Sequence, residues 1–441
     1  MARPRKRKTL GVWMNALRVG TWTLEPTGEH VFAYAPDWLA QPEARPLSLS
    51  MPLRTSAPYR GPMVEAWFDN LLPDSRAIRQ RLQSRFQVAS SQAFDLLAEI
   101  GRDCVGAVQL LPDDQAPEGI RQIRGEALTE ASVAALLRAT PVAGAGTDPA
   151  DFRISLAGAQ EKTALLWHEG GWQRPLGATP TTHIFKLPLG RVGNFQGDLS
   201  LSVENEWLCS RLVAALGLPV ARTEIGRFED QKALIVERFD RRLSADGSHW
   251  LRLPQEDLCQ ALEVTPSLKY EADGGPGPVR IMDLLLGSQQ AAEDRTRFLR
   301  SLFVFWLLCA TDGHAKNFSI RLIPGGGFRL APLYDVLSTQ PHVSSRQLQL
   351  SNAKLAMAVG NSGYHRVDQI VPRHLRETAT AVGLPAADMT AIEREIVESL
   401  DPALRAAKAS LPANFPAAMG DAIAAGARAR AALFADQAQG G

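Results

Sequence analysis

Thr311-Asp312-Gly313-His314-Ala315-Lys316-Asn317 follows a long apolar stretch, and Leu333-Tyr334-Asp335 comes shortly after it. Asn317 lies five positions after Asp312, and Asp335 lies eighteen residues after Asn317. Phosphoryl transfer uses this arrangement, in which the first Asp accepts the proton of the acceptor hydroxyl while the Asn and the second Asp hold Mg²⁺. Each residue alone is more typical of a turn or a helix cap. Together they favour a phosphotransferase that uses ATP and Mg²⁺. This interpretation requires that the other parts of a kinase site are also present in the chain.

Those other parts lie upstream, in the order that a kinase needs. Ala157-Gly158-Ala159-Gln160-Glu161-Lys162 connects two expected strands, and its small residues would let backbone N–H groups approach phosphates. Lys186 ends a strand, from which its ammonium could reach the α- and β-phosphates, and either Glu204 or Glu206 could orient it. Glu237-Arg238-Phe239 ends the last strand before the helical half, where a hinge would face adenine. The glycine loop has neither the G-x-x-x-x-G-K-[ST] nor the G-x-G-x-x-G spacing, so a P-loop NTPase is excluded.

Length and composition exclude several other classes of protein. The 441 residues are 45% hydrophobic and 22% charged, as in a globular protein with two or three subdomains. With a net charge of +1, the molecule as a whole lacks the excess of basic residues that is typical of a nucleic-acid-binding protein. No apolar run reaches the ~18–20 residues of a membrane span. The four cysteines lie fifty or more residues apart, as expected for reduced thiols: Cys104, Cys209, Cys259 and Cys309. We therefore expect a cytoplasmic protein with no membrane contact.

Hydrophobic periodicity predicts a β-rich first half and a helical second half. We expect strands at Leu10–Val12, Val19–Leu24, Leu47–Leu53, Val105–Leu111, Phe152–Leu156, Thr163–Trp167, Thr182–Leu187, Thr223–Phe228 and Ala233–Arg238. We expect helices within Met63–Phe86 with a break at Pro73, and at Asp95–Ile100, Glu130–Leu137, Ser202–Leu216, Phe298–Cys309, Pro372–Val382, Ala386–Leu400 and Ala417–Ala435. This order implies two lobes. The predicted segments are a β-rich subdomain (1–111), a linker with one helix (112–150), a core with the phosphate loop and hinge (151–240), and an all-α lobe with the catalytic loop (241–441).

Several longer motifs carry a resemblance to a known family. The chain resembles the HipA family of toxin kinases from bacterial toxin–antitoxin modules, over nearly its whole length. The motifs are Arg45–Ser50, Phe68–Asp74, Ile100–Asp103, Ala157–Leu165, Pro180–Pro188, Leu253–Asp257, Tyr270–Gly277 and Ala310–Asn317. The resemblance implies an α+β protein with a divergent two-lobed protein-kinase-like fold, acting as an ATP- and Mg²⁺-dependent serine/threonine kinase.

The resemblance also implies roles for individual residues. Asp312 matches the catalytic base, and Ser155 matches a loop serine that is autophosphorylated. The remaining matches are to nucleotide contacts, of which Asn317 and Asp335 also hold the metal: Ala157, Gly158, Ala159, Gln160, Glu161, Lys162, Lys186, Glu237, Arg238, Phe239, His314, Lys316, Asn317, Tyr334 and Asp335.

The implied partners are a small helix-turn-helix antitoxin of the HipB kind and a protein substrate. Family members phosphorylate aminoacyl-tRNA synthetases, glutamyl-tRNA synthetase being the prime example, and so stall translation and lead to dormant, drug-tolerant persistence. A basic pair that contacts operator DNA in the family is replaced here by Thr380 and Gly383. Because phosphate contacts come mainly from Arg and Lys, we expect operator binding only through the antitoxin. Arg3–Lys8 is either a solvated tail or a second route to DNA.

Two other functions remain open at this point. A small-molecule phosphotransferase of the aminoglycoside-kinase kind shares the Asp-x-x-x-x-Asn arrangement, and assays with peptide and aminoglycoside acceptors would separate the two. A pseudokinase that acts only as a co-repressor scaffold is the third possibility. The retention of Lys186, Asp312, Asn317 and Asp335 together argues against a pseudokinase, because a scaffold does not need residues that bind a metal ion.

Overall fold

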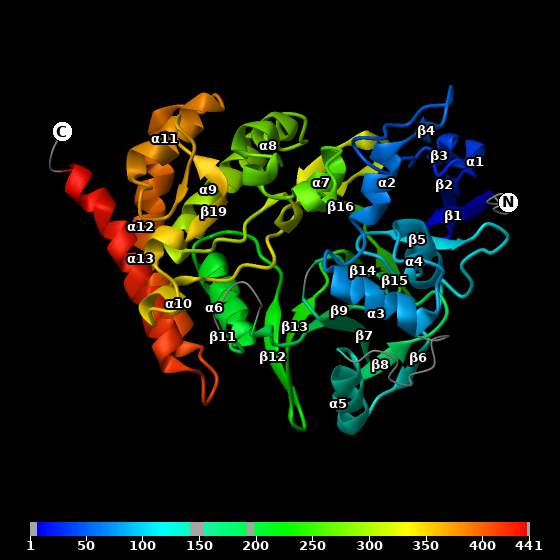
Figure 1. Ribbon diagram of the computed structural model, residues 1–441, viewed down its shortest axis with the longest axis horizontal. Coiled ribbons are helices and arrows are strands. Elements are labelled where there is room, and N and C mark those ends of the chain that lie inside the picture. Colours follow the sequence, from blue (N-terminus) through cyan, green and yellow to red (C-terminus); the bar gives the residue numbers. More distant parts are fainter. Residues whose placement is uncertain (1–6, 142–153, 159, 192–197, 439–441) are drawn as a thin grey trace, which may run out of the picture. The chain divides into compact units, whose positions relative to one another are not determined.

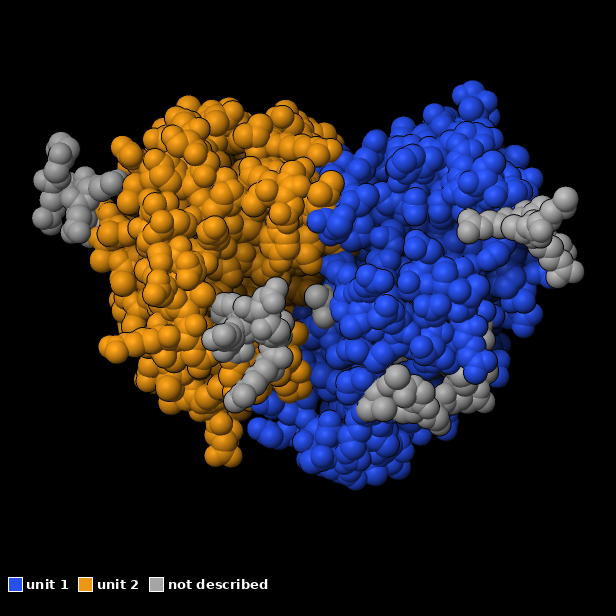
Figure 2. Space-filling view, viewed as in Figure 1, with its two compact units in different colours: residues 1–187, 226–267, 320–328 blue, residues 188–225, 268–319, 329–441 orange. Residues whose placement is uncertain are grey.

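The structure is a computed structural model that describes residues 7–141, 154–158, 160–191 and 198–438 (Figure 1). The chain divides into two compact units, which Figure 2 colours separately. Unit 1 contains Met1–Leu187, Gly226–Ser267 and Ile320–Phe328, and unit 2 contains Pro188–Ile225, Leu268–Ser319 and Arg329–Gly441. Each unit is therefore built from segments that are not contiguous in sequence. The four contiguous segments expected from the sequence stay a prediction.

The first part of unit 1 is an antiparallel sheet in the order β4-β3-β2-β1-β5. Its strands are β1 (Lys8–Met14), β2 (Leu17–Leu24), β3 (His30–Tyr34), β4 (Tyr59–Arg60) and β5 (Val108–Pro112). The helices of this part are α1 (Pro36–Leu39), α2 (Pro62–Asp69), α3 (Arg76–Phe86) and α4 (Ala93–Ile100). Burial of aromatic side chains from sheet and helices forms the core, in which Trp22 of β2 stacks on Phe68 of α2 at 3.9 Å between ring centroids.

The second sheet of the chain has the order β12-β13-β9-β7-β8-β6. Its strands are β6 (Gly125–Ala127), β7 (Lys162–His168), β8 (Gly171–Pro175), β9 (His183–Lys186), β12 (Thr223–Phe228) and β13 (Gln231–Glu237). Val133 and Leu137 of α5 (Glu130–Ala139) pack into one core with Leu165 and Phe185 of the sheet. The segment expected to be a linker thus supplies an edge strand and a helix that covers this sheet.

Short elements complete the β structure after this sheet. The hairpin β14 (Arg241–Leu243) and β15 (Trp250–Arg252) precedes a three-stranded sheet of β16 (Gln255–Asp257), β17 (Ser319–Leu322) and β18 (Phe328–Leu330). Asp257 begins α7 (Leu258–Ala261) with a capping box, in which its side chain accepts from the Gln260 backbone N–H and the Gln260 side chain accepts in return.

Unit 2 is mainly helical. Its helices are α6 (Ser202–Ala215), α8 (Pro278–Leu285), α9 (Ala291–Leu308), α10 (Gln340–Ser344), α11 (Pro372–Ala381), α12 (Ala386–Ala409) and α13 (Ala417–Ala438). The last half of α9 is buried on all sides, from Ser301 to Leu308, and α13 and α12 pack against it. The unit also contains a short hairpin of β10 (Gly190–Arg191) and β11 (Asp198–Leu199), and the hairpin of β19 (Lys354–Val359) and β20 (Tyr364–Arg366).

Most expected elements are present, and the exceptions have physical reasons. The strand expected at Leu47–Leu53 is wrong, because this segment forms only an isolated bridge between Ser48 and Met51. Leu47 and Met51 are buried, so the alternating pattern reflects the burial of side chains and not backbone hydrogen bonding to a neighbouring strand. The strand at Phe152–Leu156 falls partly outside the described residues, and Ile154 makes one bridge, to Asp103. The hairpin of β19 and β20 departs from an all-α C-terminal lobe.

Candidate active site

The catalytic segment begins where α9 ends. Cys309 has a φ of 53°, in the left-handed region, which reverses the chain after the helix. The Nδ2 of Asn317 donates to the backbone carbonyl of Asp312 at 2.6 Å, and the His314 backbone N–H donates to the same carbonyl oxygen at 2.8 Å. A Cβ at Gly313 would stand 2.4 Å from the Phe305 ring, so only glycine fits there. The segment is thereby closed into a rigid turn.

The Asp312 carboxylate lies at the surface of this turn. Its side chain is 55% exposed, whereas the His314 side chain is 4% exposed. Asp312 Oδ1 accepts a hydrogen bond from the Tyr270 hydroxyl at 2.5 Å and lies 3.8 Å from His314 Nε2. The rings of Tyr270 and His314 meet edge to face, with centroids 4.9 Å apart. A carboxylate that is held in place and still exposed can accept a proton from an incoming hydroxyl.

The second part of the motif is fastened to the first by Tyr334. Its hydroxyl donates to the Lys316 carbonyl at 2.8 Å and shares a hydrogen bond with the Ser319 hydroxyl at 2.5 Å. The next residue, Asp335, has a φ of 58°, which is uncommon for a residue other than glycine. Backbone strain of this kind concentrates at functional sites. Unit 2 therefore brings together Asp312, His314, Lys316, Asn317 and Tyr334, with the strained Asp335 adjoining them in sequence.

A Mg²⁺ site was expected at Asn317 and Asp335. Among the described residues, no group of three or more His, Cys, Asp or Glu side chains suits a metal ion. Mg²⁺ needs fewer protein ligands than that, because it usually keeps waters and substrate phosphate oxygens beside one or two carboxylates. The Asn317 amide nitrogen is committed to the Asp312 carbonyl, which leaves its oxygen to bind a cation. The oxygen donors of these two residues therefore fit Mg²⁺.

The expected phosphate loop belongs to unit 1. Gly158 has a φ of +108°, and a Cβ there would lie 2.6 Å from Lys162 Nζ, so glycine is required. The loop is held by the Asp74 backbone N–H, which donates to the Gly158 carbonyl at 3.1 Å, and by the Leu187 N–H, which donates to the Glu161 carbonyl at 3.1 Å. Gln160 donates to the Leu187 carbonyl, and Arg81 forms an ion pair with Glu161. Of the expected loop residues, Ala159 lies outside the described residues.

Two lysines meet beside this loop. Lys162 of β7 and Lys186 of β9 are direct antiparallel partners, so their side chains lie on the same face of the sheet. Lys186 is 4% exposed. Like charges placed directly opposite each other destabilise a sheet, and an anion bound between or beside them would offset that cost. The strand register therefore places two cations, Lys162 and Lys186, where they could bind a phosphate together.

Ser155 is buried at the start of the same loop. Its exposed fraction is 0%, its hydroxyl donates to the Leu71 carbonyl at 2.8 Å, and its backbone N–H donates to the Asp103 carbonyl at 3.1 Å. In this arrangement the hydroxyl is not accessible as a phosphate acceptor. Autophosphorylation at Ser155 stays a prediction, and it requires that the loop first leave this position.

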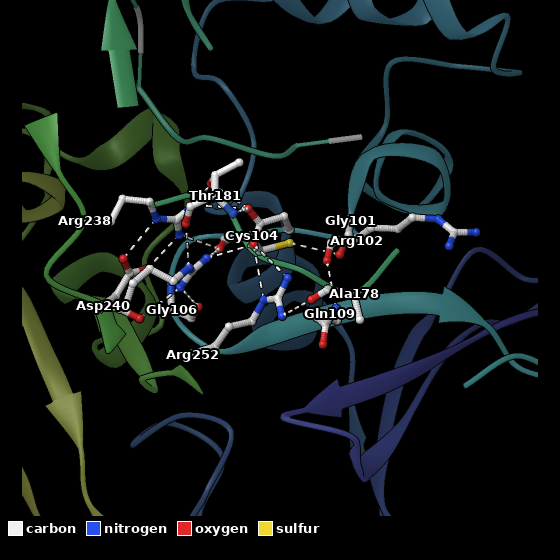
Figure 3. Close-up of polar contacts among 12 residues, drawn as sticks. Gly101, Arg102, Cys104, Gly106, Gln109, Ala178, Thr181, Arg238, Asp240 and Arg252 are labelled. Carbon is white, nitrogen blue, oxygen red and sulfur yellow. Dashed lines mark hydrogen bonds and ion pairs between the residues drawn. The ribbon is translucent and has the colours of Figure 1, made fainter. Parts of the chain in front are cut away.

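The expected hinge stays a prediction, and the structure shows how its Arg238 side chain is held. The Arg238 side chain is 1% exposed and binds Asp240 through two hydrogen bonds, of 3.0 and 2.7 Å, and the Thr181 hydroxyl at 2.9 Å (Figure 3). Its backbone N–H donates to the Thr182 carbonyl at 2.9 Å. The guanidinium is thus committed to the protein interior, so the side chain holds the hinge in place, and a contact of Arg238 with adenine stays a prediction. Glu237 is exposed and Phe239 is half-buried, so both stay candidates.

Arg238 belongs to a buried network of three arginines and two aspartates: Arg238, Arg241, Arg252, Asp103 and Asp240. Figure 3 shows that Arg238 and Arg252 converge on the chain around Cys104 and Gly106. Burial opposes ionisation of Asp103, but Arg241, Arg252 and Arg238 outweigh it and hold the pKa of Asp103 well below its usual range. The network ties the Ile100–Asp103 motif to the end of β13.

Sequence reasoning missed two residues of these sites. Arg321 donates from Nη2 to the Phe239 carbonyl at 3.2 Å, and its guanidinium lies 5.4 Å from the centre of the Phe239 ring. Tyr270, which binds the Asp312 carboxylate, belongs to the Tyr270–Gly277 motif, and the sequence assigned it no role of its own. The position of Tyr270 directly before the Glu271–Gly277 stretch was the available signal, but no local pattern could assign its partner.

Comparisons with known proteins identify the family of the chain. The model of the HipA-like C-terminal domain matches residues 154–404, and that of the HipA N-terminal domain matches residues 10–140. Protein Y4mE of Sinorhizobium fredii is 36% identical over 359 residues, covering 80% of this chain and 81% of that protein. The serine/threonine-protein kinase toxin HipA of Shewanella oneidensis is 27% identical over 421 residues, covering 90% of this chain and 89% of that protein.

A solved structure shares the fold. It is the complex of HipA, HipB and operator DNA from Shewanella oneidensis, and its matching chain has a TM-score of 0.79 at 24% identity, with 96% of each chain covered. The α+β fold and the catalytic segment define a kinase-like protein. The chain belongs to the HipA family, as its sequence motifs predicted, and it is a HipA-like kinase. No helix among the described residues is long and apolar enough to span a membrane.

Proposed function

We propose that this protein transfers the γ-phosphoryl group of ATP to serine or threonine hydroxyls of another protein, as the toxin of a toxin–antitoxin module. The observation that carries the proposal is the closed turn in which Asn317 binds the Asp312 carbonyl while the Asp312 carboxylate remains exposed. This turn presents a proton acceptor and a metal-binding amide oxygen from one rigid segment. The name of the Shewanella oneidensis relative supports both the hydroxyl specificity and the toxin role.

In the proposed reaction, the acceptor hydroxyl gives its proton to an Asp312 carboxylate oxygen as its own oxygen bonds to the γ-phosphorus. The bond from that phosphorus to the β-phosphate bridging oxygen breaks, and ADP leaves. Lys186 and Lys162 hold the phosphates, and Glu237 and Phe239 hold adenine. Mg²⁺, bound by Asn317 and Asp335, would neutralise the charge of the phosphate oxygens. Tyr270 fixes the carboxylate of Asp312 before the acceptor arrives.

We also propose that the partner is a small HipB-like helix-turn-helix antitoxin, since the structural neighbour is a complex of HipA, HipB and operator DNA. A protein of the translation machinery, such as glutamyl-tRNA synthetase, is the proposed acceptor through the family resemblance. Operator DNA would be reached through the antitoxin, because the helix α11 ends in Thr380 and Ala381 and is followed by Gly383, without the basic pair. Of the Arg3–Lys8 tail, residues 3–6 lie outside the described residues.

Replacement of Asp312 by Asn tests the catalytic assignment. Transfer of labelled phosphate from ATP to protein or peptide acceptors should fall by about 10²–10⁴-fold, since a positioned base is lost. Nucleotide affinity should change little, because Asp312 faces the acceptor. Asp283→Asn, at an exposed position of α8 in the same unit, is the matched control and should retain wild-type transfer. Transfer by Asp312→Asn within twofold of wild type would contradict the assignment, and transfer only to aminoglycosides would favour a small-molecule phosphotransferase.

A further inference from the structure

A cavity of unit 2 adjoins the Asp312–Asn317 turn. It has a volume of about 620 Å³, within the range of ligand-binding pockets. Two groups of residues line it: Tyr270, Asp273 and Thr311, and Lys354, Tyr364 and Arg366 of the hairpin β19–β20. The hairpin is itself held by α8, α11 and the 3₁₀ turn Glu271–Asp273, so both groups are parts of the folded unit.

The cavity is connected to the catalytic base by one side chain. Tyr270 lines the cavity, and its hydroxyl donates to Asp312 Oδ1 at 2.5 Å. Thr311, which also lines it, directly precedes Asp312 in sequence. A polypeptide bound in the cavity would therefore contact Tyr270, whose hydroxyl holds the Asp312 carboxylate. Neither ATP nor Mg²⁺ uses any of these lining residues in the proposed reaction.

The charges of the lining are unequal. Lys354 and Arg366 are direct cross-strand partners, and Arg366 is neutralised by Asp368 through hydrogen bonds of 3.1 and 2.7 Å. Lys354 is exposed and forms no ion pair within the part of the chain that the structure describes. Asp273 is the carboxylate of the described lining.

The other polar groups around Lys354 do not compensate its charge. His365 uses Nδ1 to bind the Leu355 carbonyl at 2.9 Å, and the Glu271 carboxylate accepts from the Ala358 backbone N–H at 2.5 Å. Tyr364 stacks on His374 with ring centroids 3.9 Å apart. The hairpin thus offers one available cation, Lys354, and a cation suits an acidic side chain carried on a polypeptide.

We propose that this cavity binds an acidic side chain of the protein acceptor, close in sequence to the hydroxyl residue that is phosphorylated. The proposal rests on the proposed function, because it identifies the acceptor subsite of the same reaction. Lys354 pairs with the acidic side chain, and Tyr270 joins the occupied cavity to Asp312. Acceptors would accordingly be selected by charge near the phosphorylated residue, in addition to any more distant contact.

Peptide binding to the full-length protein tests this directly. The probes are fluorescein-labelled nonapeptides with a central Ser and either Glu, Ala or Lys at the flanking positions, followed by fluorescence anisotropy. The wild type should bind the Glu peptides about threefold to tenfold more tightly than the Lys peptides, as for one partly exposed ion pair. Lys354→Glu should reverse that order. Lys408→Glu, an equal charge change on α12 in the same unit, should preserve it.

The proposal would be overturned by equal binding of Glu and Lys peptides by the wild type, by an unchanged preference in Lys354→Glu, or by the same change in Lys408→Glu. Tighter binding of Lys peptides by the wild type would also overturn it and would assign recognition to Asp273. Thermal unfolding of both variants checks that they fold. Phosphate transfer from labelled ATP to acceptor protein is measured separately, so a failed peptide preference with intact transfer leaves the proposed kinase function standing.

Discussion

The Ser155 hydroxyl donates a hydrogen bond to the carbonyl oxygen of Leu71 at 2.8 Å, in a place where Ser155 has no exposed area. A phosphate on this oxygen would remove the donor and add about −1.5 to −2 charges at pH 7. Burying such a charge without partners is costly. The observed position of the loop and a phosphate on Ser155 therefore exclude each other.

We predict that phosphorylated protein binds ATP more weakly than unmodified protein, because the displaced loop would no longer present Gly158 and Lys162 to the nucleotide. Nucleotide titration of the two separated forms is the measurement. Ser155→Ala is the control, since it cannot be modified and should keep the affinity of unmodified protein after incubation with ATP. Equal ATP affinities of the two forms would contradict this prediction, even if a phosphate were found on Ser155.

The metal roles predict a specific change in Mg²⁺ dependence. Asn317→Ala and Asp335→Ala should each move the midpoint of a Mg²⁺ titration of activity to higher concentration, because the cation loses one of few protein ligands. Asn317→Ala also removes the hydrogen bond to the Asp312 carbonyl, so its maximal rate should fall as well. Asp335→Asn, which keeps one oxygen donor, should lie between wild type and Asp335→Ala. Unchanged midpoints in both alanine variants would contradict the metal site.

The buried network predicts a large loss of stability for Asp103→Asn. Arg238 and Arg241 would retain only the Asp240 carboxylate, and Arg252 would lose its ion-pair partner. Leaving a buried charge without its partner typically costs about 3–5 kcal/mol. Urea denaturation measures the free energy of unfolding. Asp230→Asn, which breaks the exposed pair with Arg138 in the same unit, should have almost no effect. Similar losses in the two variants would show that the network is not a stabilising centre.

Glu256 predicts a dependence of stability on pH. Its carboxylate accepts from the Leu49 backbone N–H at 2.8 Å and from Trp67 Nε1 at 3.0 Å, and burial raises the pKa of Glu256 from an ordinary value near 4.5 to about 7. Between these values the folded state holds a proton that the unfolded state has lost. The contribution of Glu256 to stability therefore falls as pH rises from 4.5 to 7 and is constant above 7.

Glu256→Gln should remove this dependence. Its amide cannot accept from both donors, which adds a loss that is the same at every pH. The unfolding free energy of Glu256→Gln minus that of the wild type should rise by roughly 1–3 kcal/mol between pH 5 and pH 7.5. Urea denaturation at these pH values measures it. A difference that stays constant, or that moves in favour of the wild type, would contradict the raised pKa.

The local parts of the fold and site were predictable from the sequence. The turn Asp312–Asn317 is closed by hydrogen bonds between residues at most five positions apart, and a spacing rule can describe such contacts. Helices such as α11 and α12 follow from periodicity, and the family and fold expected from the motifs are confirmed. The nucleotide and metal roles of individual residues stay predictions.

Contacts between distant residues could not be predicted. Tyr270 and Asp312 lie 42 positions apart, and Arg238 and Asp103 lie 135 positions apart. A hinge motif shows that Arg238 is near a strand end, but it cannot show that the guanidinium turns inward to Asp240. The false strand at Leu47–Leu53 has the same origin, because side-chain alternation arises whenever one side of an extended segment is buried.

The interleaving of the two units along the chain has a consequence for biosynthesis. Unit 1 is completed only by residues Ile320–Phe328, where β17 supplies the middle strand of the sheet with β16 and β18. A nascent chain that has emerged through Ser267 therefore still lacks a strand of its first unit while most of unit 2 remains to be synthesised. The ribosome must release about three quarters of the polypeptide before either unit can close, as the lengths of these segments require. A partly made chain would expose the unpaired edge of β16, so premature termination before residue 320 should yield protein that depends on chaperones or aggregates, and not a free-standing first domain.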